Sequence, residues 1–207
     1  PIHGVIEDGR CTCGAYHCGK DNRGAGKHPA TPNGLIDATK DIEQLKKLWQ
    51  ERKHLNVGIA TGAVSGIFVV DIDGEQGEKD IAALGELPRT LTVKTGKGRH
   101  LFFAHPGTPI KTRTKVIGDK VDVRGDGGYV AGPGSNHASG AVYEWENPLE
   151  DIMPAPQWLM DAVTKERHHE SVLSPPAPMP AQPPASNNVQ FFRNGWSESD
   201  VLDMLSF

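Results

Sequence analysis

The chain of 207 residues contains no run of about eighteen apolar residues and no signal-peptide pattern at its start. A membrane-spanning helix and a secretory leader are therefore not expected, and we predict a cytoplasmic protein without a membrane partner. The sequence opens with Pro1 rather than with methionine, from which we expect a fragment or a processed chain.

Positive charge is not in excess. The chain carries 22 Lys and Arg against 26 Asp and Glu, a formal net charge of −4. This balance excludes a globally basic nucleic-acid-binding protein, so any polyanion would have to meet a local patch. Aromatic residues make up only 6% of the chain, which argues against base stacking as the main way of holding a single strand.

Cysteine is also scarce, with three residues that all lie between positions 11 and 18. An odd and clustered set suits a metal site in a reducing compartment better than a disulfide framework. Structural zinc takes four thiolate or imidazole ligands, so Cys11, Cys13 and Cys18 leave one position open to His17 or His28. We predict His28, because His17 adjoins Cys18 and because a glycine-rich loop lets His28 fold back. Three unligated thiols are the less favoured alternative, because few apolar residues are present to order this segment.

The middle of the chain predicts an α+β domain. Expected helices cover residues 41–53, 78–84 and 155–167, and expected strands cover 57–61, 67–72, 90–95, 99–104, 121–123, 128–131 and 142–145. Several short strands with few helices between them are typical of this fold class.

Composition changes sharply after His169. We predict one domain over residues 1–169, a proline-rich linker over 170–188, and the start of an incomplete helical domain over 189–207. The linker contains six prolines between positions 174 and 184, a composition that favours an extended chain over a packed core.

Two aspartates, Asp71 and Asp73, end the apolar run at 67–70. Strand side chains alternate, so both carboxylates project from one face about 7 Å apart. Two such groups repel each other unless a cation lies between them, and hard oxygen ligands suit Mg²⁺ or Mn²⁺. The alternative is a strand that simply ends in an aspartate–glycine turn.

Glycine and positive charge occur together in residues 95–100. Glycines before a strand let the backbone approach a phosphate closely, and Lys97 and Arg99 add positive charge. His100 follows this cationic loop directly, so we predict that it contacts phosphate. The alternative is a satisfied core histidine, the more usual role of a lone histidine in an apolar strand.

A third carboxylate, Asp122, lies between two valines. An inward carboxylate at this position is costly without a cation, so we predict Asp122 as a third ligand beside Asp71 and Asp73. Arg124 shares its face and is suited to bidentate phosphate binding. The alternative is an exposed edge strand on which Asp122 and Arg124 face water.

Two weaker features complete the predicted phosphate site. The loop at 132–137 offers Ser135 and His137 as donors to phosphate, although an ordinary connecting turn explains it equally well. Residues 89–124 carry nine Lys and Arg against two acids, which predicts a polyanion footprint. A solvated cationic face remains the alternative for 111–120, and Asp126 is assigned to the glycine-rich turn.

The order of the motifs resembles one family. After the cysteines and a Gly-Lys-His-Pro sequence come motifs at 56–62, 71–73, 98–103, 121–125 and 132–135. Each is weak alone, but five in order are specific. Over residues 2–165 the chain resembles the N-terminal bifunctional DNA primase/polymerase (prim-pol) domain of phage and plasmid replication proteins, within the archaeo-eukaryotic primase superfamily.

This resemblance implies an RRM-like catalytic sheet packed with an N-terminal α/β unit, here carrying the zinc-binding loop. It assigns the acidic metal motif to Asp71 and Asp73, the histidine motif to His100 and the third acidic position to Asp122. The implied activity is template-directed nucleotidyl transfer with Mg²⁺ or Mn²⁺. The implied partners are single-stranded DNA template and primer, nucleoside triphosphates, and downstream helical and helicase domains. For a phage-encoded protein the location would be the host cell cytoplasm.

The sequence departs from the family pattern in two places. It starts after the position of an N-terminal amphipathic helix that family domains often have, and Arg99 occupies a place where a small residue is common. Two other functions also stay open. A metal-dependent nuclease could use the same three carboxylates, and a single-stranded DNA-binding module could use the basic residues without catalysis.

Overall fold

The computed structural model describes residues 1–15, 18, 24–50 and 54–165. The linker predicted over 170–188, the helical segment predicted over 189–207 and the alternative zinc ligand His17 lie outside the described residues. Among the described residues, no helix is both long enough and apolar enough to cross a membrane.

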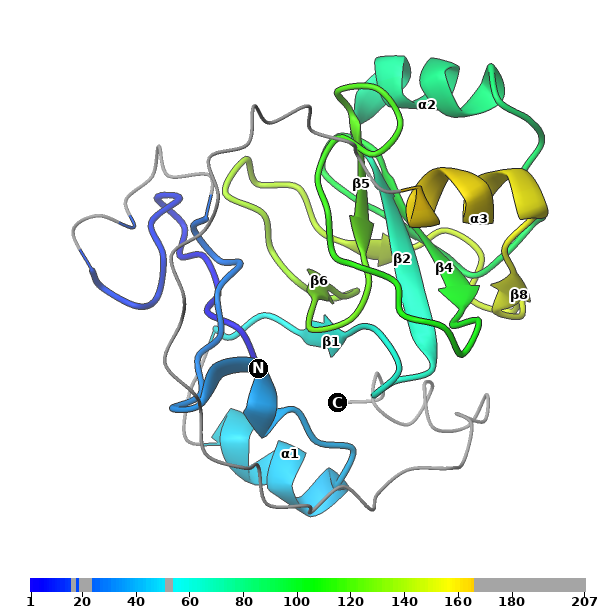
Figure 1. Ribbon diagram of the computed structural model, residues 1–207. Helices are drawn as coiled ribbons and strands as arrows, with labels where there is room; N and C mark the ends of the chain where they lie inside the picture. Colours follow the sequence, from blue (N-terminus) through cyan, green and yellow to red (C-terminus); the bar gives the residue numbers. More distant parts are fainter. Residues whose placement is uncertain (16–17, 19–23, 51–53, 166–207) are drawn as a thin grey trace, which may run out of the picture.

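A six-stranded sheet forms the centre of the molecule (Figure 1). Its main path has the order β5-β2-β4-β3-β7 with antiparallel neighbours, and β8 pairs with β4 in parallel. The strands are β2 (Ile67–Ile72), β3 (Thr92–Lys94), β4 (Arg99–Ala104), β5 (Val121–Arg124), β7 (Glu144–Trp145) and β8 (Met153–Pro154). The central strands β2 and β4 have the bounds that their apolar, β-branched and aromatic sequences predict.

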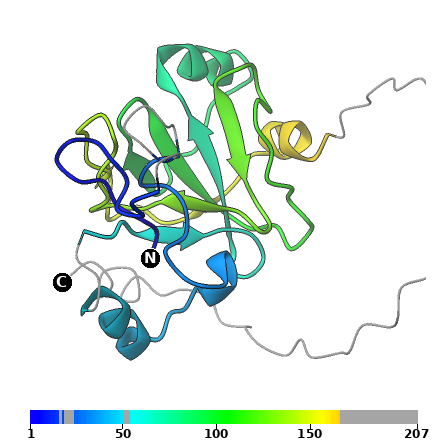
Figure 2. The same cartoon turned by 90° about the vertical axis from the view of Figure 1, so that its left-hand side faces the viewer.

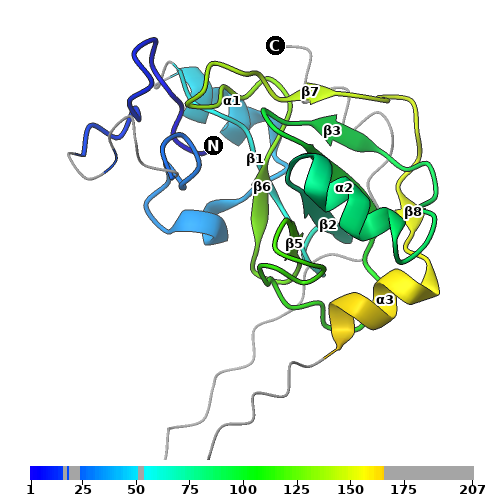
Figure 3. The same cartoon turned by 90° about the horizontal axis from the view of Figure 1, so that it is seen from above.

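One face of the sheet packs against two helices, α2 (Gly74–Ala82) and α3 (Gln157–Thr164), as Figure 3 shows from above. Alternate β2 side chains, Phe68, Val70 and Ile72, are fully buried on this side. Leu159 and Val163 from α3 lie in the same cluster. We call this side the helix face.

The opposite face combines apolar packing with the acidic residues. Val69, Val93 and Phe102 are buried there in a second cluster. A two-stranded sheet of β1 (Gly58–Ala60) and β6 (Tyr129–Ala131) contributes to the cover. Because Asp71, His100 and Asp122 alternate with residues of the helix face, they lie on this second side. We call it the acidic face.

The N-terminal segment and α1 (Ile42–Gln50) lie away from α2 and α3, as Figures 1 and 2 show. A 3₁₀ helix, η2 (Gly34–Asp37), precedes α1. Asp41 caps α1 as expected, because its Oδ1 accepts the N–H groups of Glu43 and Gln44 at 2.9 and 3.1 Å. The α+β fold class is confirmed.

The main differences from the expected elements are local. Helix α2 starts four residues earlier than expected, directly after β2, because Gly74 adopts a φ of +70° at the turn. Glycine has low helix propensity, and because of Gly74 and Gly77 the sequence pattern did not predict a helix that begins at residue 74. The short elements η2 and β8 were not predicted.

Candidate active site and zinc-binding loop

Strand register brings the predicted catalytic residues together on the acidic face. In the antiparallel ladders, Asp71 of β2 lies directly opposite His100 of β4 on one side and Asp122 of β5 on the other. Directly opposed side chains on adjacent strands start about 5 Å apart. The Nε2 atom of His100 lies 3.4 Å from Oδ1 of Asp71. Three residues far apart in the sequence therefore form one row across the sheet.

Arg124 neutralises this row. Its guanidinium donates to Oδ2 of Asp122 at 2.8 Å and lies 3.8 Å from Oδ2 of Asp71. The backbone N–H of Lys115 donates to the other oxygen of Asp122 at 2.9 Å. Arg124 thus supplies the positive charge that two neighbouring carboxylates require, and it shares the face of Asp122 as the sequence predicted.

Asp71 is held in its ionised form. Its burial would raise the pKa of the carboxyl group, but the hydrogen bond with His100 and the charges of His100, Arg124 and Lys27 lower it overall. The nearby Tyr143 shows the opposite effect, because burial and then the charges of Asp71 and Asp73 raise its pKa to about 12. Tyr143 is therefore a neutral hydroxyl beside a fixed negative charge at neutral pH.

Asp73 lies just beyond the end of β2, where it is exposed at the start of α2. Its backbone N–H donates to the carbonyl of Lys120 at 2.8 Å, which holds it beside β5. Its charge acts on both Tyr143 and His137. Asp73 therefore lies near the row of Asp71 without being part of the strand register.

The cationic turn at 95–98 packs against the end of β2. A Cβ at Gly98 would lie only 1.8 Å from the carbonyl oxygen of Ile72, so only glycine allows this approach. Thr95 fixes the turn by accepting the N–H of Gly98 at 3.0 Å. The turn carries the exposed Lys97, whose charge contributes to lowering the pKa of His137. The sequence predicted that the glycines of this turn let the backbone come close to a phosphate. In the structure, Gly98 instead lies close to the backbone of residues 72–74.

Arg99 is not brought to the acidic face. It alternates with His100 along β4, and its Nε and Nη2 atoms donate to the two carboxylate oxygens of Glu78 on α2, each at 2.7 Å. This bidentate pair fastens α2 to the sheet on the helix face. The predicted phosphate role of Arg99 has no support from this geometry.

Ser135 is also directed elsewhere. The residue is fully buried, its Oγ accepts the N–H of Val57 at 3.0 Å, and it lies 3.3 Å from the carbonyl oxygen of the same residue. It therefore joins the glycine-rich loop to the start of β1. His137 is half-buried at the acidic face, where its Nδ1 accepts the N–H of Ser139 at 3.1 Å.

Several cations of the basic stretch at 89–124 are paired within the protein. Arg89 pairs with Glu150 at 2.6 Å, and Arg113 donates to carbonyl groups at the end of α3. Arg99 and Arg124 are also paired, with Glu78 and Asp122, so much of the positive charge in this stretch is used in contacts within the protein. Fewer of these cations are therefore left for the predicted polyanion footprint, and the exposed Lys97 is one of them.

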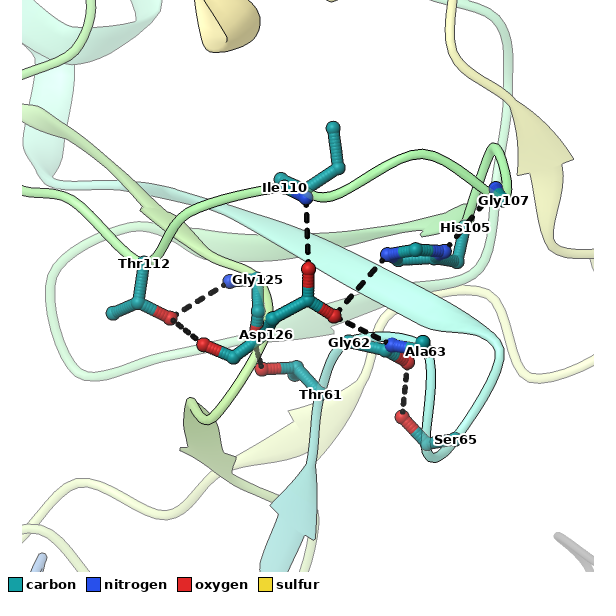
Figure 4. A network of polar contacts seen from close by, with 10 residues as sticks. All are labelled: Thr61, Gly62, Ala63, Ser65, His105, Gly107, Ile110, Thr112, Gly125 and Asp126. Carbon is teal, nitrogen blue, oxygen red and sulfur yellow. Dashed lines mark hydrogen bonds and ion pairs between the residues drawn. The ribbon is translucent and has the colours of Figure 1, made fainter. Parts of the chain in front are cut away.

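Asp126 belongs to a separate network (Figure 4). Its carboxylate accepts the N–H groups of Ala63 and Ile110, each at 2.8 Å, and lies 3.4 Å from Nε2 of His105. Burial would raise the pKa of Asp126, but these two N–H donors and His105 lower it overall. Asp126 thus ties three loops together, in agreement with its assignment to the turn.

The four predicted zinc ligands are close together. The ligand atoms of Cys11, Cys13, Cys18 and His28 all lie within 4.8 Å of one another. The Nε2 atom of His28 is 3.3 Å from the sulfur of Cys11 and 3.4 Å from that of Cys18. Ligand atoms of one tetrahedral zinc ion are separated by roughly 3.5 to 4 Å, so this group fits zinc.

Charge in the cluster favours a cation as well. Burial, followed by the neighbouring thiols of Cys11 and Cys13, raises the pKa of Cys18 to about 12. Three thiolates this close repel one another unless a metal ion neutralises them. Within the described residues, this is the one group in which three or more ligand atoms lie so close together.

The acidic face offers donor atoms of the kind that Mg²⁺ and Mn²⁺ prefer. Asp71, Asp73 and Asp122 offer hard carboxylate oxygens at one end of two adjacent strands. Within the described residues their oxygen atoms do not form a group as close as the zinc ligands, and Arg124 contacts both Asp71 and Asp122.

Sequence reasoning missed Tyr143 and Lys27 as neighbours of the acidic row. Tyr143 lies between two histidines, with ring centroids 5.8 Å from His100 and 6.2 Å from His137. Lys27 comes from the zinc-binding loop and acts on Asp71 by charge. The Gly-Lys-His-Pro sequence marked this loop, but no local signal showed which strand it would meet.

Comparison with models of known protein families finds a match over most of the chain. A family model described as bifunctional DNA primase/polymerase, N-terminal, matches residues 11–158. This range covers more than half of the chain and includes the cysteine cluster, β2, β4 and β5. A search of curated proteins finds no match.

Proposed function

The chain belongs to the bifunctional DNA primase/polymerase family, and from this premise we propose that it catalyses template-directed nucleotidyl transfer in phage or plasmid replication. It would synthesise primers and extend them on single-stranded DNA. The observation that carries the proposal is the row of His100, Asp71 and Asp122 across three adjacent strands.

In the proposed reaction, the primer 3′-hydroxyl attacks the α-phosphate of an incoming nucleoside triphosphate. A new bond forms between the 3′ oxygen and the α-phosphorus, and the hydroxyl proton passes to water. The bond between the α-phosphorus and the oxygen that bridges it to the β-phosphate breaks, and pyrophosphate leaves. No protein nucleophile is required. Two divalent ions held by Asp71, Asp73 and Asp122 would supply Lewis acidity to the hydroxyl and to the leaving group.

The other side chains bind and orient the nucleotide. His100, held against Asp71, faces the site from β4 and would donate to the triphosphate. Lys97 and His137 add donors from two loops. Arg124 is suited to exchange its contact with Asp122 for a phosphate, because a guanidinium binds both groups by the same fork geometry. Downstream helical and helicase domains remain predicted partners.

A gel assay tests the proposed function. The protein is incubated with single-stranded template, with and without primer, with nucleoside triphosphates and Mg²⁺ or Mn²⁺. We expect a labelled primer to become longer only when nucleotide and divalent ion are both present. A labelled strand that becomes shorter without nucleotide would instead identify a nuclease, and an unchanged strand that is bound would identify a non-catalytic DNA-binding module.

Arg99 and Arg124 should behave differently in this assay. Arg99→Gln should leave the extension rate within about twofold and lower stability by less than about 1 kcal/mol, because its pair with Glu78 is about one-third exposed. Arg124→Gln removes a charged donor from the acidic face and should slow extension at least about tenfold. Extension kinetics and thermal unfolding of both variants check this contrast. Equal losses of activity would restore the phosphate role that the sequence suggested for Arg99.

A further inference from the structure

A buried asparagine joins the zinc-binding loop to the loop of His137. Asn56 is 2% exposed, and its side-chain Nδ2 donates to the carbonyl oxygens of Gly26 and Asn136, each at 2.9 Å. Its Oδ1 accepts the N–H of Asn136, also at 2.9 Å. Gly26 and Asn136 directly precede Lys27 and His137 in the sequence. One amide group therefore fixes the backbone next to both residues.

Lys27 is held at two further points. Its carbonyl oxygen accepts the hydroxyl of Tyr129 on β6 at 2.8 Å, and its neighbour His28 belongs to the cysteine–histidine cluster. The Lys27 side chain is half-buried, yet its ammonium group has no hydrogen bond or ion pair with any residue that the structure describes. By contrast, Arg99 and Arg124 are both paired with carboxylates.

The positive charges near His137 come from two separate segments of the chain. After burial, the charges of Lys27 and Lys97 are the main causes that lower the pKa of His137. Two ammonium groups near one imidazole repel one another unless an anion lies between them, and phosphate is the anion that such donors bind.

We propose that Lys27 binds phosphate oxygens at the acidic face together with Lys97 and His137, and that Asn56 and the zinc cluster position it there. The inference rests on the proposed function and deepens it, because it makes the zinc-binding loop part of the substrate site. The phosphate belongs either to the triphosphate of the nucleotide or to the backbone of the DNA strand. Asn56 is a positioning residue, whereas Lys27 touches the ligand.

Binding measurements on Lys27 variants test the inference. Lys27→Gln is compared with Lys27→Arg, which keeps the charge, and with Lys94→Gln, which removes an exposed lysine from the helix face of β3. The probes are inorganic tripolyphosphate, which competes with a fluorescent nucleotide, and a labelled single-stranded oligonucleotide. Circular dichroism and zinc content confirm that each variant is folded.

We expect Lys27→Gln to weaken binding about tenfold or more, as for the loss of one charged hydrogen bond. Lys27→Arg should recover most of the affinity, and Lys94→Gln should bind like the wild type. A loss with tripolyphosphate assigns Lys27 to the nucleotide, and a loss with the oligonucleotide alone assigns it to the DNA strand. Wild-type affinity of Lys27→Gln for both probes would overturn the inference.

Removal of zinc tests whether the zinc cluster positions Lys27. Chelation should weaken wild-type binding of whichever probe Lys27→Gln binds less tightly. It should add little to the defect of Lys27→Gln, because both changes act on one contact. Equal effects of chelation on the two proteins would refute the positioning by zinc. The primer-extension assay of the wild type separates the two proposals. If the wild type extends primers while Lys27→Gln binds both probes normally, only the Lys27 inference fails.

Discussion

Replacing Asp71 with asparagine should lower the rate of nucleotide addition by at least about a thousandfold, because the change removes the central negative charge that would hold a divalent ion. Asparagine keeps the shape of the side chain and still offers an oxygen to His100. The sheet should therefore remain folded, with Arg124 still paired to Asp122. Single-turnover primer extension measures the rate, and thermal unfolding checks the fold.

Asp161→Asn is the matched control for this change. Asp161 is an exposed residue of α3 on the helix face, where its carboxylate accepts a hydrogen bond from Gln157 at 2.8 Å. The two variants have the same net charge, so a general effect of charge on DNA binding would slow both equally. A folded Asp71→Asn variant that extends primers at the wild-type rate would end the assignment of Asp71.

The second large effect is expected at the zinc cluster. The reduced wild-type protein should contain about one zinc ion per chain, and Cys18→Ser and His28→Asn should lose most of it, because a structural site needs all four ligands. Since few apolar residues stabilise this loop, loss of the ion should expose residues 1–30 to protease. Metal analysis and limited proteolysis measure both effects.

His54→Asn provides the control for the histidine variant. His54 is exposed, lies outside the cluster and has a φ of +64°, a backbone conformation that asparagine tolerates. It should keep its zinc and its resistance to protease. A wild-type protein that binds no zinc when purified in reduced form without chelator would rule the site out.

The sequence predicted the residues of the acidic row because strand periodicity is a local property. Alternation in the segments around Asp71 and Asp122 indicated which side chains share a face. The same alternation separates Arg99 from His100, which are consecutive in β4. The prediction for Arg99 relied instead on its closeness in sequence to Lys97, and the structure pairs it with Glu78 of α2.

Long-range contacts explain what could not be predicted. The buried hydroxyl of Ser135 meets Val57, and Asn56 meets both Gly26 and Asn136, so their partners lie in other segments of the chain. A serine in a glycine-rich loop has the same local pattern whether it binds phosphate or another loop. Only the packing of β1 against β6 and the closure of the zinc-binding loop distinguish these roles.

The most direct test of the acidic face is to locate a divalent ion beside a bound nucleotide. We propose crystals grown with Mn²⁺ and a non-hydrolysable nucleoside triphosphate, with the ion located by its anomalous scattering. The account predicts an ion about 2.1 Å from a carboxylate oxygen of Asp71, with the triphosphate next to His100. A nucleotide and its ion bound on the helix face, away from Asp71, would contradict it.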